Sequence, residues 1–333
     1  MPTNRRQELI TDVLNLSDAP QAFNDIALRV FRFQAEFNPL YKRYLTLLKK
    51  DPNSIQHLHE IPFLPISFFK THLIKTGTWE ATTTFTSSGT TGQIPSKHLL
   101  PSLDFYLENT VRGFARQYSH PSNWIILALL PSYLERSGSS LVAMAQHWIQ
   151  NSRYPESGFF LHDLSSLQKT LQKRPKDVPV LLLGVSFALL DFAEQYPMDL
   201  EGVTIMETGG MKGRRKEITR PELHIILKNA FNVSAIHSEY GMTELLSQGY
   251  AKGGSMFTPS STLKALSTEI NDPFCFNEAG KTGVLHFIDL ANINTCSFIA
   301  TEDIGRVEKN GQFEVLGRLD IAELRGCNLL IES

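Results

Sequence analysis

The sequence predicts an α/β protein with a mostly parallel sheet, covering helices and a smaller β-rich subdomain. Four runs are long enough to form strands, and helical segments separate them: residues 123–130, 178–185, 203–210 and 233–241. The first two are almost entirely apolar, which is typical of parallel strands buried on both faces. A chain of 333 residues, 42% of them hydrophobic, is also long enough to bury a large core.

The first 80 residues are predicted to form a helical region that packs on this core. Five apolar residues recur at the spacing of one helix face: Phe23, Ile26, Ala27, Val30 and Phe31. Asp18 is a candidate N-cap for this helix, and Pro39 interrupts its pattern. The α/β nucleotide-binding core is then expected over residues 81–250.

A second helix is predicted over residues 218–231. Thr219 is its expected N-cap, with Pro221 and Glu222 in the first turn. Four residues are expected on its buried face: Leu223, Ile226, Leu227 and Ala230.

Beyond Gly253 the pattern changes to short strands and turns, which predicts a β-rich subdomain over residues 251–316. Asn310-Gly311 lies between alternating residues and predicts a hairpin with a type I′ turn. Residues 317–333 are expected to form a hinge remnant and a C-terminal tail.

Composition argues against several classes of partner. Lys plus Arg number 32 and Asp plus Glu number 34, so the net charge of -2 suggests neither nucleic acid nor an anionic membrane. The longest strongly apolar run, residues 124–130, is far short of the roughly 20 residues of a membrane span. Charges near the N-terminus stand where a secretory signal would be apolar, and three scattered cysteines suggest no disulfide framework. We therefore expect a cytoplasmic protein, with Cys275 and Cys296 as small buried residues.

Residues 84–100, TFTSSGTTGQIPSKHLL, hold seven hydroxyl side chains and two glycines. Glycine allows successive backbone N–H groups to approach one anion, and hydroxyl groups add donors, so the loop favours polyphosphate. The P-loop motif of many NTPases does not fit, because four residues separate Gly92 from Lys97 and no glycine precedes the lysine. A solvated surface loop is the alternative.

Four stretches in this order resemble the motifs of acyl-adenylate-forming enzymes. They are SSGTTG at 87–92, followed by Pro95 and Lys97, YGMTE at 240–244, TEDIG at 301–305 and GRLD at 317–320. Within that superfamily, ETGGMKG at 207–213 and ELRGC at 323–327 look most like the acyl-protein synthetases of bacterial bioluminescence. The resemblance implies activation of a carboxylic acid, most simply a fatty acid, with ATP and Mg²⁺.

The resemblance also implies roles for individual residues. The phosphates of ATP would be held by Thr86, Ser87, Ser88, Gly89, Thr90, Thr91, Gly92 and Lys97. Glu244 would help to hold Mg²⁺, Asp303 would accept the ribose hydroxyls, and Arg318 would contact the ribose or a phosphate. Gly209, Gly210, Tyr240, Gly241 and Thr243 would line the nucleotide and acyl site. In isolation, Glu244 could be an ordinary helix-start acid, and Asp303 and Arg318 could be turn residues.

Cys327 is the candidate acyl acceptor. A thiolate is a strong nucleophile, and Arg325 nearby would lower its pKa. The resemblance implies that this cysteine carries the acyl group before passing it to a partner such as a reductase. A small core cysteine is the alternative.

The chain also departs from the superfamily pattern. Only sixteen residues follow Gly317, so the C-terminal domain that carries a lysine used in adenylation is expected to be essentially absent. Either no such lysine is needed, another group serves, or adenylation is impaired. Two other functions therefore stay open: an acyl-CoA ligase that uses CoA or a carrier pantetheine, and a non-catalytic binding subunit.

Overall fold

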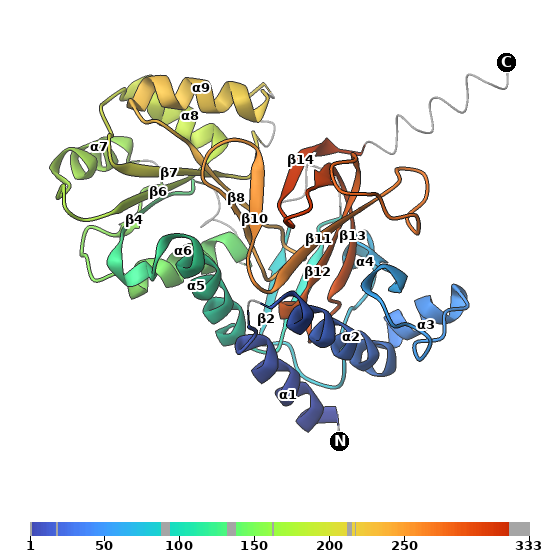
Figure 1. The fold of residues 1–333 in the computed structure, drawn as a ribbon. Helices are drawn as coiled ribbons and strands as arrows, with labels where there is room; N and C mark the ends of the chain where they lie inside the picture. The colour runs from blue at the N-terminus through green and yellow to red at the C-terminus, as the bar shows by residue number, and fades with distance from the viewer. Residues whose placement is uncertain are drawn as a thin grey trace, which may run out of the picture.

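A computed structural model describes residues 2–17, 19–87, 94–131, 138–161, 163–211, 215–216 and 218–319. Within these residues, twelve strands form one long mixed sheet, and two more form a separate ribbon (Figure 1). From one edge to the other, the long sheet runs β11 (Leu263–Thr268), β12 (Gly283–Asp289), β13 (Phe298–Val307), β14 (Phe313–Arg318), β10 (Met256–Pro259), β9 (Gly249–Ala251), β8 (His237–Tyr240), β7 (Val203–Thr208), β6 (Val180–Val185), β4 (Ile125–Leu129) and β5 (Gly158–Phe159). Strand β1 (Leu64–Pro65) pairs with β13, and β2 (Thr83–Thr86) pairs with β3 (Lys97–Leu100).

Helices cover both faces of the long sheet. The α-helices are α1 (Pro2–Leu14), α2 (Pro20–Phe37), α3 (Pro39–Leu47), α4 (Phe68–Thr71), α5 (Asp104–Tyr118), α6 (Ser140–Asn151), α7 (Leu164–Lys173), α8 (Ser186–Gln195) and α9 (Arg220–Phe231). Short 3-10 helices are η1 (Leu58–Glu60), η2 (Pro121–Asn123) and η3 (Leu290–Asn292). No helix among the described residues combines the length and the apolarity needed to cross a bilayer.

The half of the sheet from β5 to β8 is parallel, as the sequence predicts. Every residue of β4 and β6 is buried, because α5 and α6 cover one face of this half and α8 and α9 cover the other (Figure 1). The predicted α/β fold class with covering helices is therefore confirmed.

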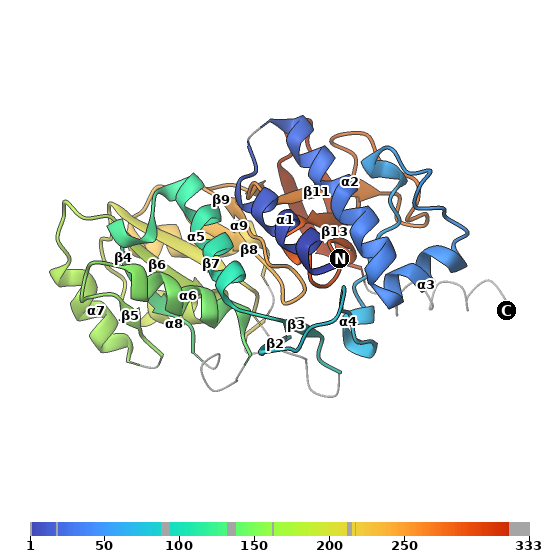
Figure 2. The same ribbon diagram turned by 90° about the horizontal axis from the view of Figure 1, so that it is seen from below.

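The other half, from β9 to β14, is antiparallel and packs against the N-terminal helices (Figure 2). The ring of Phe31 from α2 makes edge contacts with Tyr41 and Phe298. The buried amide of Gln34 donates to the Asn292 carbonyl at 2.9 Å and accepts from the Ser297 N–H at 2.9 Å. Residues from opposite ends of the described chain thus share one core.

The N-terminal region contains α1 to α4 and the short strand β1. All five apolar residues predicted for α2 are buried. The helix begins at Pro20 with Ala19 in the N-cap position, and Asp18 lies outside the described residues. Pro39 begins the next helix, whose N-cap is Asn38.

Helix α9 confirms its predicted start and corrects its predicted buried face. Thr219 and Glu222 form a capping box. Ile226, however, is 42% exposed, and His224 takes a buried place on the face instead. The error arises because the helix packs through a narrower stripe than the spacing of its apolar residues suggests.

The predicted β13–β14 hairpin is confirmed, but its turn is longer than predicted. The Gly311 N–H donates to the Glu308 carbonyl at 2.9 Å, and the Glu308 N–H donates to the Gln312 carbonyl at 2.8 Å. Gly311 has a positive φ of 83°, whereas Asn310 does not, so a type I′ turn is excluded. Of the cysteines expected to be buried, Cys296 is buried and Cys275 is exposed.

A buried carboxylate fixes the turn that follows β8. Asp289, fully buried at the end of β12, accepts hydrogen bonds from the Leu246 N–H at 2.7 Å, the Ser247 N–H at 3.1 Å and the Ser247 hydroxyl at 2.6 Å. It also accepts from the Ala291 N–H at 3.0 Å. One side chain therefore satisfies donors on two segments that are more than forty residues apart.

We predict that Asp289→Asn destabilises the protein by about 2–4 kcal/mol, because an amide cannot accept all of these hydrogen bonds and leaves buried donors unpaired. Urea unfolding followed by circular dichroism measures the free energy of unfolding. The matched control is Asp272→Asn, at an exposed turn where, among the described residues, the carboxylate accepts only from the Phe274 N–H. The control should cost about 0.5 kcal/mol or less, and equal losses in the two variants would contradict the prediction.

Candidate active site

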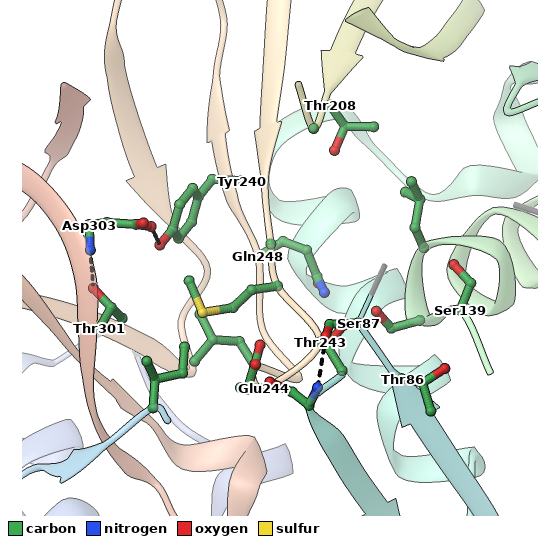
Figure 3. Close-up of a pocket in the computed structure, with 18 of the residues that line it drawn as sticks. Thr86, Ser87, Ser139, Thr208, Tyr240, Thr243, Glu244, Gln248, Thr301 and Asp303 are labelled. Atoms are coloured by element: carbon green, nitrogen blue, oxygen red, sulfur yellow. Dashed lines mark hydrogen bonds between the residues drawn. The ribbon is translucent and has the colours of Figure 1, made fainter. Parts of the chain in front are cut away.

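A cavity of about 380 Å³ opens where the parallel half of the sheet meets the antiparallel half (Figure 3). Nine of the residues singled out in the sequence line it: Thr86, Ser87, Gly209, Tyr240, Gly241, Thr243, Glu244, Asp303 and Arg318. They come from five segments spread over more than 230 residues of sequence. The structure therefore brings the four motifs to one place, although Ser88, Gly89, Thr90, Thr91, Gly92 and Cys327 lie outside the described residues.

The ribbon formed by β2 and β3 flanks the hydroxyl-rich loop, since β2 ends at Thr86 and β3 begins at Lys97. Thr86 and Lys97 face each other across this antiparallel pair. The Ser96 N–H donates to the Ser87 hydroxyl at 2.8 Å, and the Thr86 N–H donates to the Gly138 carbonyl at 2.8 Å. Gly138 has a φ of 87°, and a Cβ there would lie 2.7 Å from the Thr84 carbonyl oxygen. Only glycine allows the chain before α6 to approach the ribbon this closely.

Lys97 is exposed and is not among the residues that line the cavity; the lysine that lines it is Lys70. Strand alternation does not explain this difference, because Thr86 shares a face of the ribbon with Lys97 and does line the cavity. The neighbouring pair Phe85 and His98 points into the protein and is buried, so Thr86 and Lys97 occupy the other face of the ribbon. Lys70 belongs to α4, which has no distinctive sequence motif.

Glu244 lies in the turn that follows β8, and its side chain is buried, with 6% of the residue exposed. Burial raises the pKa of its carboxyl group, whereas a hydrogen bond from Ser96 and the charges of Arg318 and Lys70 oppose the rise. The Asn292 amide donates to the Glu244 carbonyl at 2.8 Å and holds the backbone there. The carboxyl group thus lies beside the hydroxyl-rich ribbon.

His98 connects that ribbon to the same turn. Its Nδ1 lies 2.8 Å from the Thr243 carbonyl oxygen, and its Nε2 lies 3.0 Å from the Thr295 hydroxyl. The carbonyl can only accept, so we assign the proton to Nδ1 and the acceptor role to Nε2. Burial lowers the pKa of His98 to about 4, so the ring is neutral at pH 7.

Tyr240 and Asp303 join two of the motifs directly. The Tyr240 hydroxyl donates to Asp303 Oδ2 at 2.7 Å (Figure 3). Burial raises the pKa of the Asp303 carboxyl group, while the Tyr240 hydrogen bond and the charge of Arg318 oppose the rise. Arg318 lies opposite Asp303 in the β13–β14 register and donates to Glu302 at 3.1 Å. No described residue donates a hydrogen bond to the second carboxyl oxygen of Asp303.

The two glycines after β7 differ in position. Gly209 has a φ of 70° and lines the cavity, whereas Gly210 is exposed and does not line it. The Ser186 hydroxyl is 3.1 Å from the Gly209 carbonyl and 3.3 Å from Glu207 Oε2, so it connects the turn at Gly209 to the end of β7.

Other residues that line the cavity were not found from the sequence. They are Lys70, Tyr106, Ser139, Ser140, Glu239 and Gln248, among others. Ser139 is the N-cap of α6 and accepts from the Val142 N–H, and paired serines before an apolar run could have indicated that helix start. The rest are single residues on unremarkable elements, and no sequence pattern marks them.

The carboxylate chemistry fits a magnesium ion bound together with phosphate. No group of three or more His, Cys, Asp or Glu residues in the described part of the chain is placed to hold a metal. Mg²⁺ commonly uses one or two carboxylates and takes its remaining ligands from phosphates and water. Glu244 is a buried carboxyl group in the cavity wall that fits one such ligand position, and a nearby cation would favour its ionised form against the effect of burial.

Comparisons with protein-family models and with curated proteins find no match. Solved structures do match. An open conformation of 2-hydroxyisobutyryl-CoA ligase with 2-HIB-AMP and CoA aligns with a TM-score of 0.67 and 12% identity, over 92% of this chain and 72% of that one. ATP-bound MatB from Rhodopseudomonas palustris aligns with a TM-score of 0.55 and 15% identity, over 73% of this chain and 49% of that one.

A chimera of MatB and BclM with bound ATP gives a similar result, with a TM-score of 0.56, 14% identity and coverage of 73% and 48%. This chain thus matches about half the length of the MatB structures. At such identities the likeness establishes only the fold, which this chain shares with these structures.

We predict that His98→Gln weakens the dependence of stability on pH between about 6.5 and 4. The unfolded chain binds a proton below the ordinary histidine pKa of about 6.5, but folded His98 does so only near pH 4. Because the unfolded state holds more protons in this window, stability falls as pH falls, by up to about 1.4 kcal/mol per unit from this group.

Urea unfolding between pH 7 and pH 4.5 tests this prediction. The stability difference between the unmodified protein and His98→Gln should shrink on acidification. His59→Gln, which removes an exposed histidine, should follow the unmodified protein. A difference that stays constant with pH would mean that His98 is not held neutral.

Proposed function

We propose that this protein activates a carboxylic acid with ATP, forming an acyl adenylate and pyrophosphate. The observation that carries the proposal is the convergence on one cavity of Thr86 and Ser87, the turn at Thr243 and Glu244, and Asp303 with Arg318. The matching solved structures include ligases with bound 2-HIB-AMP and proteins with bound ATP, which supports the same chemistry here.

In the proposed reaction, a carboxylate oxygen of the acid attacks the α-phosphorus of ATP. The bond from the α-phosphorus to the bridging oxygen breaks, and pyrophosphate leaves with the electron pair. Thr86, Ser87 and the loop at residues 88–92 would donate hydrogen bonds to the β- and γ-phosphates. Magnesium, held by Glu244 and the phosphates, would neutralise part of their charge.

The ribose would be held at the other end of the cavity. Asp303 has one oxygen engaged by Tyr240, so its second oxygen would accept from the ribose hydroxyls. Arg318 would contact the ribose or the α-phosphate. Lys70 is a cation on the cavity wall. We propose that it supplies positive charge near the phosphates, which is the role that the sequence suggested for Lys97.

The acid-dependent exchange of labelled pyrophosphate into ATP tests the reaction. We expect exchange with the unmodified protein, and a rise of about 10- to 100-fold in KM for ATP in Asp303→Asn, since a hydrogen bond to a charged group contributes about 1.5–3 kcal/mol. Tyr240→Phe keeps the carboxylate and removes only its internal partner, so its effect should be smaller. ATP binding by calorimetry without exchange for any acid would instead support a non-catalytic binding subunit.

For the fate of the acyl group, we propose transfer from the adenylate to a thiol, with release of AMP. Cys327 in the same chain is the first candidate, as a carrier toward an acyl-accepting partner such as a reductase. A CoA thiol is the second, because one matching structure is a CoA ligase with bound CoA. A fatty acid is the substrate that the sequence motifs suggest.

Labelling with a radioactive acid and ATP separates these acceptors. We expect hydroxylamine-sensitive label on the protein, lost in Cys327→Ser and kept in Cys275→Ser, which removes an exposed cysteine. Label that persists in Cys327→Ser would exclude the thioester at this position. Turnover that rises with CoA and survives Cys327→Ser would identify an acyl-CoA ligase.

A further inference from the structure

The cavity has a second region on the side away from Asp303. Tyr240 and Glu239 are adjacent on β8, so their side chains point to opposite faces of the sheet. Tyr240 points toward Asp303, as Figure 3 shows. Glu239 lies beside Thr208, its neighbour across the β7–β8 pair, on the face covered by α5 and α6. Tyr106 and Met144 from these helices also line the cavity there.

Glu239 has an incomplete set of partners. It is 7% exposed, and its Oε2 accepts from the Thr208 hydroxyl at 2.5 Å. Its Oε1 accepts from no described residue and lies 2.6 Å from the place where a Cβ on Gly241 would be. Among the described residues, no lysine or arginine pairs with this carboxyl group. Burial and the charge of Glu207 raise its pKa to about 7.

Gln248 is the second polar group of this region. It is 3% exposed, and its Oε1 is buried without a hydrogen-bond partner in the described part of the protein. Its side chain projects into the pocket (Figure 3). The unpaired oxygen itself is closed off from the cavity, so Gln248 contributes a polar amide to the wall and not a free acceptor.

The connectivity of the ligands indicates which one reaches this region. The adenine is bonded to the ribose, and the ribose is proposed to lie at Asp303, on the opposite side of β8. The acid is joined to the nucleotide only through the α-phosphate, so its hydrocarbon part can extend away from the ribose. Glu239 and Gln248 would then face the substituents of the acid.

We propose that Glu239 and Gln248 select a carboxylic acid whose hydrocarbon part carries a hydrogen-bond donor, either a hydroxyl or an amino group. This inference rests on the proposed function, and it replaces the plain fatty acid suggested by the sequence motifs with a substituted acid. A plain aliphatic chain would leave Glu239 Oε1 without a donor, whereas a hydroxyl or amino group would donate to it, with the polar Gln248 side chain beside it in the cavity wall. Sites built on such hydrogen bonds reject analogues that lack the donor more strongly than apolar pockets reject a missing methylene.

Acid-dependent pyrophosphate exchange by the full chain tests the inference with matched acids. Butyrate, 3-hydroxybutyrate and 4-aminobutyrate differ mainly in the donor, and tetradecanoate represents a fatty acid. We expect kcat/KM for the hydroxy or the amino acid to exceed that for butyrate by about tenfold or more. The two substituted acids distinguish a hydroxyl donor from an ammonium group.

The variant Glu239→Leu with Gln248→Leu should reduce this preference to about twofold or reverse it toward butyrate, with KM for ATP unchanged. Glu239→Gln, which keeps the shape, should retain part of the preference for a hydroxyl and lose that for an ammonium group. The matched control is Glu314→Gln, which removes a carboxyl group that is 8% exposed on β14 and paired with Arg306 away from the cavity. Its acid preference should equal that of the unmodified protein.

The possible failures are distinguishable. If none of these acids, nor any other, supports exchange, the proposed function fails. If exchange occurs but plain acids are used equally well or better, the function stands and this inference is overturned. A changed KM for ATP in the Glu239 variants, with acid preference unaltered, would place the nucleotide base there and would also overturn it.

Discussion

The site depends on the way in which the Asp289 carboxylate holds the turn after β8. Four donors from two separate segments converge on this one buried group. The turn carries Thr243 and Glu244, whose positions relative to the ribbon are fixed from the other side by His98. A polar clamp in the interior is costly unless every group in it is paired. Here the pairing is nearly complete, which explains how a loop at the edge of two half-sheets can be well defined.

The cavity lies where two separately packed cores meet. One core surrounds the parallel strands, and the other joins α2 and α3 to β12 and β13. Strand β8 is the last parallel strand before the antiparallel half. In α/β sheets, ligands bind beyond the carboxyl ends of strands at such changes of order. The hydrogen bond between Tyr240 and Asp303 spans this junction, so the nucleotide would be held by groups from both halves.

The sequence was informative where chemistry lies in short contiguous motifs. The fold class, the strands around β4 and β6 and the capping box of α9 follow from local patterns and are confirmed. The motif residues at 240–244, at 303 and at 318 meet in one cavity. Lys97 does not line it, although its cross-strand partner Thr86 does, and no pattern in the sequence distinguishes the two. Lys70, Glu239 and Gln248 are single residues whose proximity depends on the tertiary fold, so no pattern along the chain identifies them. Ile226 was misplaced for a related reason: the covered stripe of a helix depends on its neighbours.

The alternation along β8 has a consequence for how specificity could change. Adjacent positions, 239 and 240, face two different compartments, one proposed for the acid and the other for the nucleotide. A single codon change at the first position could therefore alter the choice of acid while ATP handling stays intact. An insertion or deletion within the same strand would exchange the two faces and disrupt both at once. Such an arrangement leaves substrate choice open to divergence while it constrains the length of the strand.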